Sequence, residues 1–224
     1  MALDIFAPRA RTGGGGGSTD DVVGRFRSGH QINKRPISLK EWRVTTGDPE
    51  VANLIAELLG GEVGTWESKG EDNLEVFTDN GKVDVILDGV DAVDARMVVW
   101  ARGAKRIVVC QDEVYDTEGG PFECELGGWR TKAEHAEQGH VCEPLIKVRF
   151  RLAEAPDIGY FEYQTGAWSL VSQVGYILGD IEDNDEEGEG VLATLGLEAA
   201  EFEKDGKPVK FTRPVITVTG PVTD

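Results

Sequence analysis

The sequence has little cysteine, methionine or histidine, and it has no long apolar run. Its 224 residues include 3 Cys, 2 Met and 3 His. An odd and sparse set of cysteines argues against a disulfide framework and for a reducing compartment. No apolar run reaches the ~18 residues of a membrane-spanning helix, and the first residues lack the apolar stretch of a secretory signal. These absences predict a cytoplasmic protein, made inside a host cell, without membrane association.

The motifs of common enzymes are absent as well. The chain contains no GxSxG nucleophile elbow, no Walker loop and no HExxH zinc motif. The glycines at 13–17 neither match GxGxxG nor follow a strand pattern, so they predict a flexible tether. The acidic run 180–189 lacks the ligand register of a calcium loop and is predicted to be a solvated loop. We therefore expect a protein that is not an enzyme.

Positive charge is scarce and unevenly placed. The chain has 41 acidic and 23 basic residues, for a net charge of −18. Residues 1–43 carry eight basic and four acidic side chains, which leaves −22 for the rest. Because Lys and Arg supply most non-specific affinity for phosphates, we expect no sequence-specific DNA binding by the protein alone. A basic N-terminal segment, including Arg25 and Arg27, on an acidic body favours a protein-binding module; the alternative is that the acidity only maintains solubility.

What the chain does contain predicts a flexible segment over residues 1–20 and a single domain over 21–224. Asp48 can cap a helix and Pro49 fits its first turn. An apolar stripe at helical spacing then runs to residue 59, and Gly60 permits the stop. A second amphipathic helix is predicted over 168–181. Residues 22–35 are polar and are predicted to be irregular.

Alternating apolar residues and turn dipeptides predict strands that run in hairpins. Three hairpins are expected: 74–79 with 82–87 across Asn80-Gly81, 96–102 with 105–110 across Gly103, and 191–203 with 209–219 across Asp205-Gly206. Further strands are expected over 145–152 and 160–163. Since the strands do not alternate with helices, the predicted class is α+β with a mainly antiparallel sheet and two helices.

The long segment 110–143 is the strongest chemical cluster. It contains all three cysteines and two of the three histidines: Cys110, Cys124, His135, His140 and Cys142. A structural zinc needs four such ligands and can organise a loop that buries no core. We predict zinc held by the three cysteines and His140, with His135 as the alternative; reduced thiols and surface histidines are the competing interpretation. A short helix is expected near 131–138, and Trp129 is a candidate partner-binding residue.

Several phrases resemble one phage family. They are GRFRSG (24–29), KRPI (34–37), EWRVTTGDPEVA (41–52), KGEDNLEVFT (69–78), VDVILDG (83–89), RMVVWAR (96–102), FRLAEAPDIGYFEYQTGAWSL (150–170) and KFTRPVITVTGP (210–221). In combination they resemble the recombination directionality factors of actinobacterial phages, which partner large serine integrases. The resemblance covers nearly the whole chain.

The resemblance implies a non-enzymatic regulator. It would bind a large serine integrase on attachment-site DNA, chiefly near the coiled-coil insertion of the integrase, and switch recombination from integration to excision. Related factors carry several cysteines in the loop corresponding to 110–143, which implies a metal site; here only Cys124 lies mid-loop, so a histidine would substitute. Two alternatives from other classes stay open: an acidic DNA-mimic inhibitor of a DNA-binding enzyme, and a zinc-dependent hydrolase.

Overall fold

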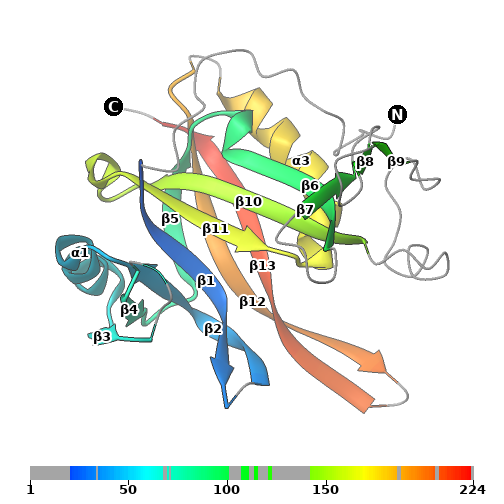
Figure 1. Ribbon diagram of the computed structural model, residues 1–224. Helices are drawn as coiled ribbons and strands as arrows, with labels where there is room; N and C mark the ends of the chain where they lie inside the picture. The colour runs from blue at the N-terminus through cyan, green and yellow to red at the C-terminus, as the bar shows by residue number, and fades with distance from the viewer. Residues whose placement is uncertain are drawn as a thin grey trace.

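The structure is a computed structural model. It describes residues 21–33, 35–67, 70, 72–100, 107–110, 114–115, 121–122, 142–185, 188–204 and 207–222. Within these residues the chain forms an 11-stranded sheet, a separate two-stranded ladder and two α-helices, which Figure 1 shows. The mainly antiparallel α+β class predicted from the sequence is confirmed. None of the described helices is long and apolar enough to cross a membrane.

The order of strands along the sheet is β13-β12-β5-β10-β11-β1-β2-β4-β3, and β6 pairs with both β10 and β7. The N-terminal half comprises β1 (Val22–Ile32), β2 (Arg35–Thr46), α1 (Pro49–Leu59), β3 (Val63–Thr65), β4 (Leu74–Phe77), β5 (Lys82–Leu87) and β6 (Val93–Trp100). The rest comprises β7 (Ile107–Cys110), β8 (Val114–Tyr115), β9 (Pro121–Phe122), β10 (Cys142–Leu152), β11 (Tyr160–Thr165), α3 (Trp168–Asn184), β12 (Val191–Lys204) and β13 (Lys207–Pro221), with 3-10 turns at Val90–Ala92 and Pro156–Ile158.

Helix α1 forms where its local signals predict it. Asp48 accepts a hydrogen bond from the backbone N–H of Glu50 at 2.8 Å, so the predicted cap is confirmed. Gly60 adopts a φ of 79° at the other end, a conformation that side chains other than glycine rarely take. The apolar stripe, which includes Val51 and Ile55, is buried against the sheet.

The prediction of an irregular segment over 22–35 is wrong, because β1 is a strand within the sheet. It pairs antiparallel with β2 and parallel with β11, so that Arg25 lies opposite both Thr45 and Glu162. The partner β11 comes more than 120 residues later in the chain. Such long-range pairing stabilises a strand that local sequence signals alone do not indicate.

The predicted hairpin at Asn80-Gly81 is also wrong, although both of its strands exist. β4 pairs with β2 and β3, whereas β5 pairs with β10 and β12. Neither Asn80 nor Gly81 adopts the positive φ that a type I′ turn requires. The chain instead crosses here from one part of the sheet to another. Gly81 passes so close to the carbonyl oxygen of Lys40 that an added Cβ would be 2.3 Å from it.

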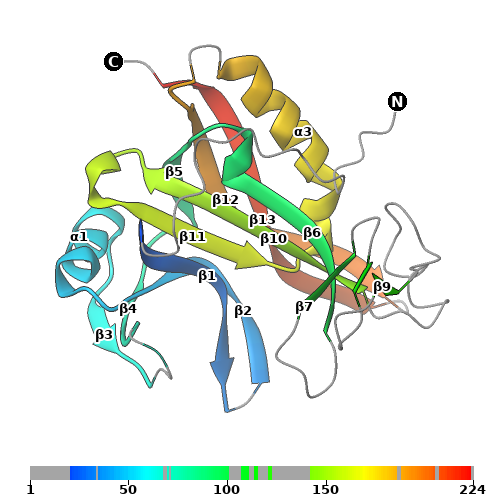
Figure 2. The same cartoon turned by 45° about the horizontal axis from the view of Figure 1, so that its top comes forward.

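The other hairpins pair as predicted. β6 pairs with β7, and β12 pairs with β13 over nearly their whole lengths. Helix α3 extends beyond the predicted end to Asn184, so the start of the acidic run 180–189 is helical and not loop. Figure 2 shows α3 lying along β13, against which it packs.

The core comprises the inward side of the curled sheet and the buried faces of α1 and α3. Phe26 on β1 is at its centre, with edge-to-face contacts to Trp42, Phe150 and Phe161 at centroid distances of 5.2 to 5.7 Å. The buried face of α3 adds further apolar side chains: Leu170, Val171, Val174, Ile177, Leu178 and Ile181. One face of β1, β2, β10 and β11 is therefore committed to the core, and the opposite face is available for contacts.

Three predictions fall on residues outside those described. They are the tether over 1–20, the short helix near 131–138, and most of the segment 110–143.

Candidate partner-binding site

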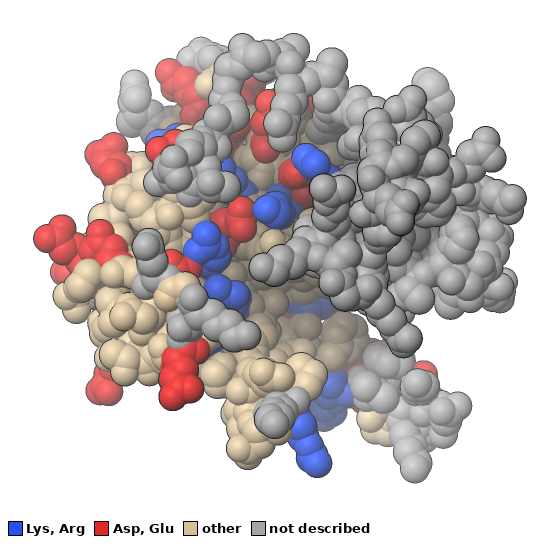
Figure 3. Space-filling view, viewed as in Figure 1, with Lys and Arg blue, Asp and Glu red and all other residues tan. Residues whose placement is uncertain are grey.

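The outward face of the sheet carries the basic side chains. Strand alternation places Arg25 and Arg27 opposite in direction to the buried Phe26. Arg27 lies opposite Arg43 on β2. Arg25 lies opposite Glu162 on β11, and Glu162 lies opposite Arg149 on β10. We call the aligned cations the cationic face: Arg25, Arg27, Arg43, Arg96, Lys147, Arg149 and Arg151. Figure 3 shows basic side chains in a band across the side that faces the viewer.

Most of these cations are paired with carboxylates of the same face. The pairs are Arg25–Asp72, Arg43–Glu75, Arg96–Asp94, Lys147–Glu162, Arg149–Asp21 and Arg151–Asp88. Cations that are already neutralised in this way contribute little to the phosphate contacts on which DNA affinity depends. The band of basic side chains is thus a network of ion pairs, and its net charge is small.

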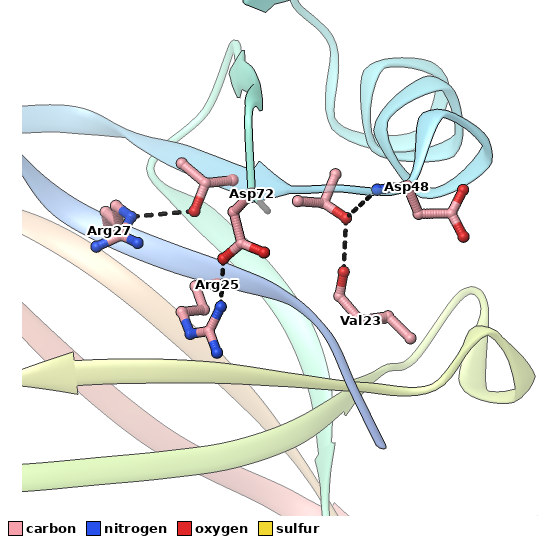
Figure 4. A network of polar contacts seen from close by, with 7 residues as sticks. Val23, Arg25, Arg27, Asp48 and Asp72 are labelled. Atoms are coloured by element: carbon pink, nitrogen blue, oxygen red, sulfur yellow. Dashed lines mark hydrogen bonds and ion pairs between the residues drawn. The ribbon is translucent and has the colours of Figure 1, made fainter. Parts of the chain in front are cut away.

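Arg27 differs from its neighbours. Among the described residues it forms no ion pair, and its Nε donates to the hydroxyl of Thr45 at 3.0 Å, as Figure 4 shows beside the Arg25–Asp72 pair. Burial lowers the pKa of the Arg27 guanidinium, and the positive charges of Arg43 and Arg25 lower it further. Arg27 therefore holds a half-buried charge in a place that disfavours positive charge.

Two of these arginines lie against the ring of Trp66. Its backbone N–H donates to the carbonyl of Asn73 at 3.1 Å, which closes the connection between β3 and β4 and holds the indole over β2. The Cζ of Arg43 lies 4.4 Å from the indole centroid and the Cζ of Arg27 lies 5.9 Å from it. Both distances are within the range of cation–π attraction. We call Arg27, Arg43 and Trp66 the arginine–tryptophan cluster.

Two donors of this cluster are buried without an acceptor. Arg43 is only 5% exposed; its Nε donates to Glu75 at 2.6 Å, whereas its Nη2 has no hydrogen-bond partner in the described part of the chain. The Nε1 of Trp66 likewise has none among the described residues. Buried polar groups in native proteins are nearly always hydrogen-bonded, so two such donors at one ring make the cluster a candidate binding site.

An apolar rim adjoins the cluster. Phe77 lies opposite Arg43 in the β2–β4 ladder and is 39% exposed. Its ring contacts the ring of His30 edge-to-face, with 5.6 Å between the two centroids. Beyond Arg27 and Arg43, β1 and β2 pair only with each other in the described ladders and project from the body of the sheet (Figure 1). This projecting hairpin exposes Ile32 and Ile37. Arginine and aromatic side chains beside exposed apolar ones are typical of protein–protein interfaces.

The predicted zinc ligands are only partly within the described residues. Cys110 ends β7 opposite Met97, and Cys142 begins β10 opposite Val99. One strand, β6, therefore separates their backbones by two interstrand spacings, ~10 Å.

Cys124, His135, His140 and Trp129 lie outside the described residues, so the zinc site stays a prediction. Within the described ones, no group of three His, Cys, Asp or Glu is placed to hold a metal.

Sequence reasoning singled out Arg25 and Arg27 as partner-binding candidates but not Arg43 or Trp66. The alternation of Trp42 and Val44 with Arg43 in EWRVTT is the signal that could have indicated that Arg43 faces away from the core. Nothing local indicated that Trp66 lies over it, because that contact depends on the pairing of β2 with β4.

Comparison with known proteins assigns the chain to a family. No solved structure gives a significant match. The model of the Gp3-like family, described as recombination directionality factor-like, matches residues 23–219, which include almost all of β1 through β13. The chain belongs to this recombination directionality factor-like family.

Proposed function

We propose that the protein is a phage recombination directionality factor that binds a large serine integrase on attachment-site DNA and switches recombination from integration to excision. The observation that carries the proposal is the family match over residues 23–219. The protein would act in the cytoplasm of the bacterial host, as a regulator without catalytic residues of its own.

The described surface supports contact with a protein rather than with bare DNA. The basic side chains of the cationic face are mostly ion-paired, and the whole chain carries a net charge of −18. The arginine–tryptophan cluster and its apolar rim instead have the composition of an interface hot spot. A protein contact of this kind lets the integrase position the factor near DNA without direct recognition of the bases.

The switch follows from differential affinity. A factor that prefers one arrangement of the integrase–DNA complex shifts the population toward that arrangement by the ratio of its two affinities. Because binding and conformation are thermodynamically coupled, a single preference promotes excision and inhibits integration together.

Recombination in vitro with the cognate integrase tests the proposal. Reactions between the left and right sites, and between the phage and bacterial sites, are run with and without the factor. We expect the factor to promote the first reaction and inhibit the second, to leave the mobility of bare DNA unchanged at physiological salt, and to slow the integrase–DNA complex further. Tight sequence-specific binding to bare DNA, or no effect on either reaction, would contradict the proposal.

A further inference from the structure

We propose that the arginine–tryptophan cluster is a binding site for one carboxylate, contributed by an Asp or Glu side chain of the protein partner. The first argument is the set of donors. Among the described residues, Arg43 Nη2 and Trp66 Nε1 are buried without acceptors, and Arg27 has no ion-pair partner. A buried donor that lacks an acceptor costs stability, and an incoming acceptor removes that cost.

The second argument concerns charge. Arg27 aligns with Arg43 and lies two residues from Arg25, and the nearby carboxylates of Asp72 and Glu75 already pair with those two neighbours. One additional negative charge would therefore balance the unpaired guanidinium of Arg27. A carboxylate suits this position because the planar guanidinium can donate two parallel hydrogen bonds to its two oxygens.

The third argument distinguishes a protein carboxylate from a DNA phosphate. A nucleic-acid backbone presents a row of phosphates and needs a row of free cations. Within the cationic face the six other cations are paired, and the exposed side chains of Phe77, Ile37 and Ile32 are apolar. A single anion surrounded by apolar contacts matches an acidic side chain within a protein interface, with the apolar rim excluding water.

Matched substitutions test the site in two assays. Arg27→Gln removes the unpaired charge but keeps a donor for Thr45, and Trp66→Phe keeps the ring beneath Arg43 but removes the indole N–H. Arg213→Gln is the control, because it makes the same change of charge on β13, outside the cationic face, where Arg213 pairs with Glu198. Circular dichroism and urea unfolding verify that each variant is folded.

The first assay measures affinity for the integrase, and here the inference rests on the proposed function. Loss of a hydrogen-bonded ion pair predicts that Arg27→Gln raises Kd roughly 10- to 100-fold. Trp66→Phe should raise Kd by a smaller factor, and Arg213→Gln should leave it unchanged. An unchanged Kd for folded Arg27→Gln would overturn the assignment to a carboxylate of the partner.

The second assay does not need the integrase. The indole N–H signal of Trp66, assigned by its loss in Trp66→Phe, is followed by NMR during titration with sodium acetate at ionic strength held constant with sodium chloride. We expect a saturable shift in the wild-type protein and none in Arg27→Gln. Absence of the shift, or a shift with inorganic phosphate and duplex DNA but not with acetate, would overturn the proposal. If wild-type protein fails to bind integrase, the proposed function fails while this assay still decides whether the carboxylate site exists.

Discussion

Thr78 and Trp42 exchange hydrogen bonds across 36 residues of sequence. The backbone N–H of Trp42 donates to Thr78 Oγ1 at 3.0 Å, and the backbone N–H of Thr78 donates to the carbonyl oxygen of Trp42 at 2.9 Å. The hydroxyl of Thr78 can in turn donate to the carbonyl of Asn80 at 2.7 Å. The side chain thus continues the β2–β4 pairing for one more residue at the point where the chain turns toward β5.

Replacing Thr78 with Val should destabilise the protein. Valine has the shape of threonine but leaves the buried N–H of Trp42 without an acceptor, so the free energy of unfolding should fall by about 1–3 kcal/mol. Urea unfolding followed by tryptophan fluorescence measures this. Thr194→Val is the matched control, because the Thr194 hydroxyl bonds Asp84 at the exposed surface and its loss should change stability by less than about 0.5 kcal/mol. Equal effects at both positions would contradict this account of Thr78.

Phe26→Ala should be among the most damaging single substitutions. The ring is 1% exposed and has three edge-to-face aromatic neighbours, so its removal leaves a cavity at the centre of the core. We expect a loss of about 3–5 kcal/mol in the free energy of unfolding, measured by urea denaturation. The control is Tyr176→Ala on α3, where the side chain is 79% exposed and the effect should be small. A loss below about 1 kcal/mol at Phe26 would show that the core can collapse around the site.

The buried phenol of Tyr163 predicts a loss of stability in alkali. Burial raises the pKa of Tyr163 above its ordinary value of about 10. Below that pH the phenol is protonated in both the folded and the unfolded protein. Above it the phenol loses its proton first in the unfolded protein. The contribution of Tyr163 to the free energy of unfolding therefore falls as pH rises from about 10 through the pKa of Tyr163 in the folded protein.

Comparison of wild-type protein with Tyr163→Phe isolates this effect. The variant loses the hydrogen bond between Tyr163 and Ser28, which spans 3.0 Å, and this loss should be a constant offset of about 1 kcal/mol between about pH 7 and pH 9. Above pH ~10 the difference in the free energy of unfolding should move in favour of the variant. A difference that stays constant throughout would mean that Tyr163 ionises equally easily in both states.

Elemental analysis tests the predicted zinc. Protein never exposed to a chelator should contain about one zinc per chain if three cysteines and one histidine bind it. Cys124→Ser should lower the zinc content, whereas His30→Gln should not, because His30 lies on β1 beside Phe77 and outside the cysteine segment. Zinc well under half an equivalent in the wild-type protein would contradict the prediction.

Elements with local signals were predictable from the sequence. α1 depends on Asp48, Pro49 and Gly60, which act within a few residues of each other, and it forms at its predicted bounds. The β12–β13 hairpin likewise connects neighbouring segments. β1 was missed because its residues are mostly polar and one of its two partners, β11, is remote in the sequence. β4 was paired wrongly because a turn dipeptide indicates a possible hairpin without excluding other partners.

The candidate site shows the same division. Arg25 and Arg27 stand out as part of a basic N-terminal segment, so charge alone indicated them. Whether Arg43 and Trp66 find acceptors depends on how three strands and a connection pack together in the folded protein. No pattern in the sequence predicts which hydrogen-bond donors remain without acceptors once the chain has folded.

The parallel contact of β1 with β11 has a consequence for synthesis on the ribosome. β1 emerges well before β11, which begins at Tyr160, so one side of β1 has no partner until that later strand has been made. During that interval β1 is an unprotected edge that could pair with other chains. Folding must also wait for a contact of long sequence separation, which slows it. Fragments that end before Tyr160 should therefore aggregate, and expression should benefit from slow synthesis or from chaperones that cover the first hairpin.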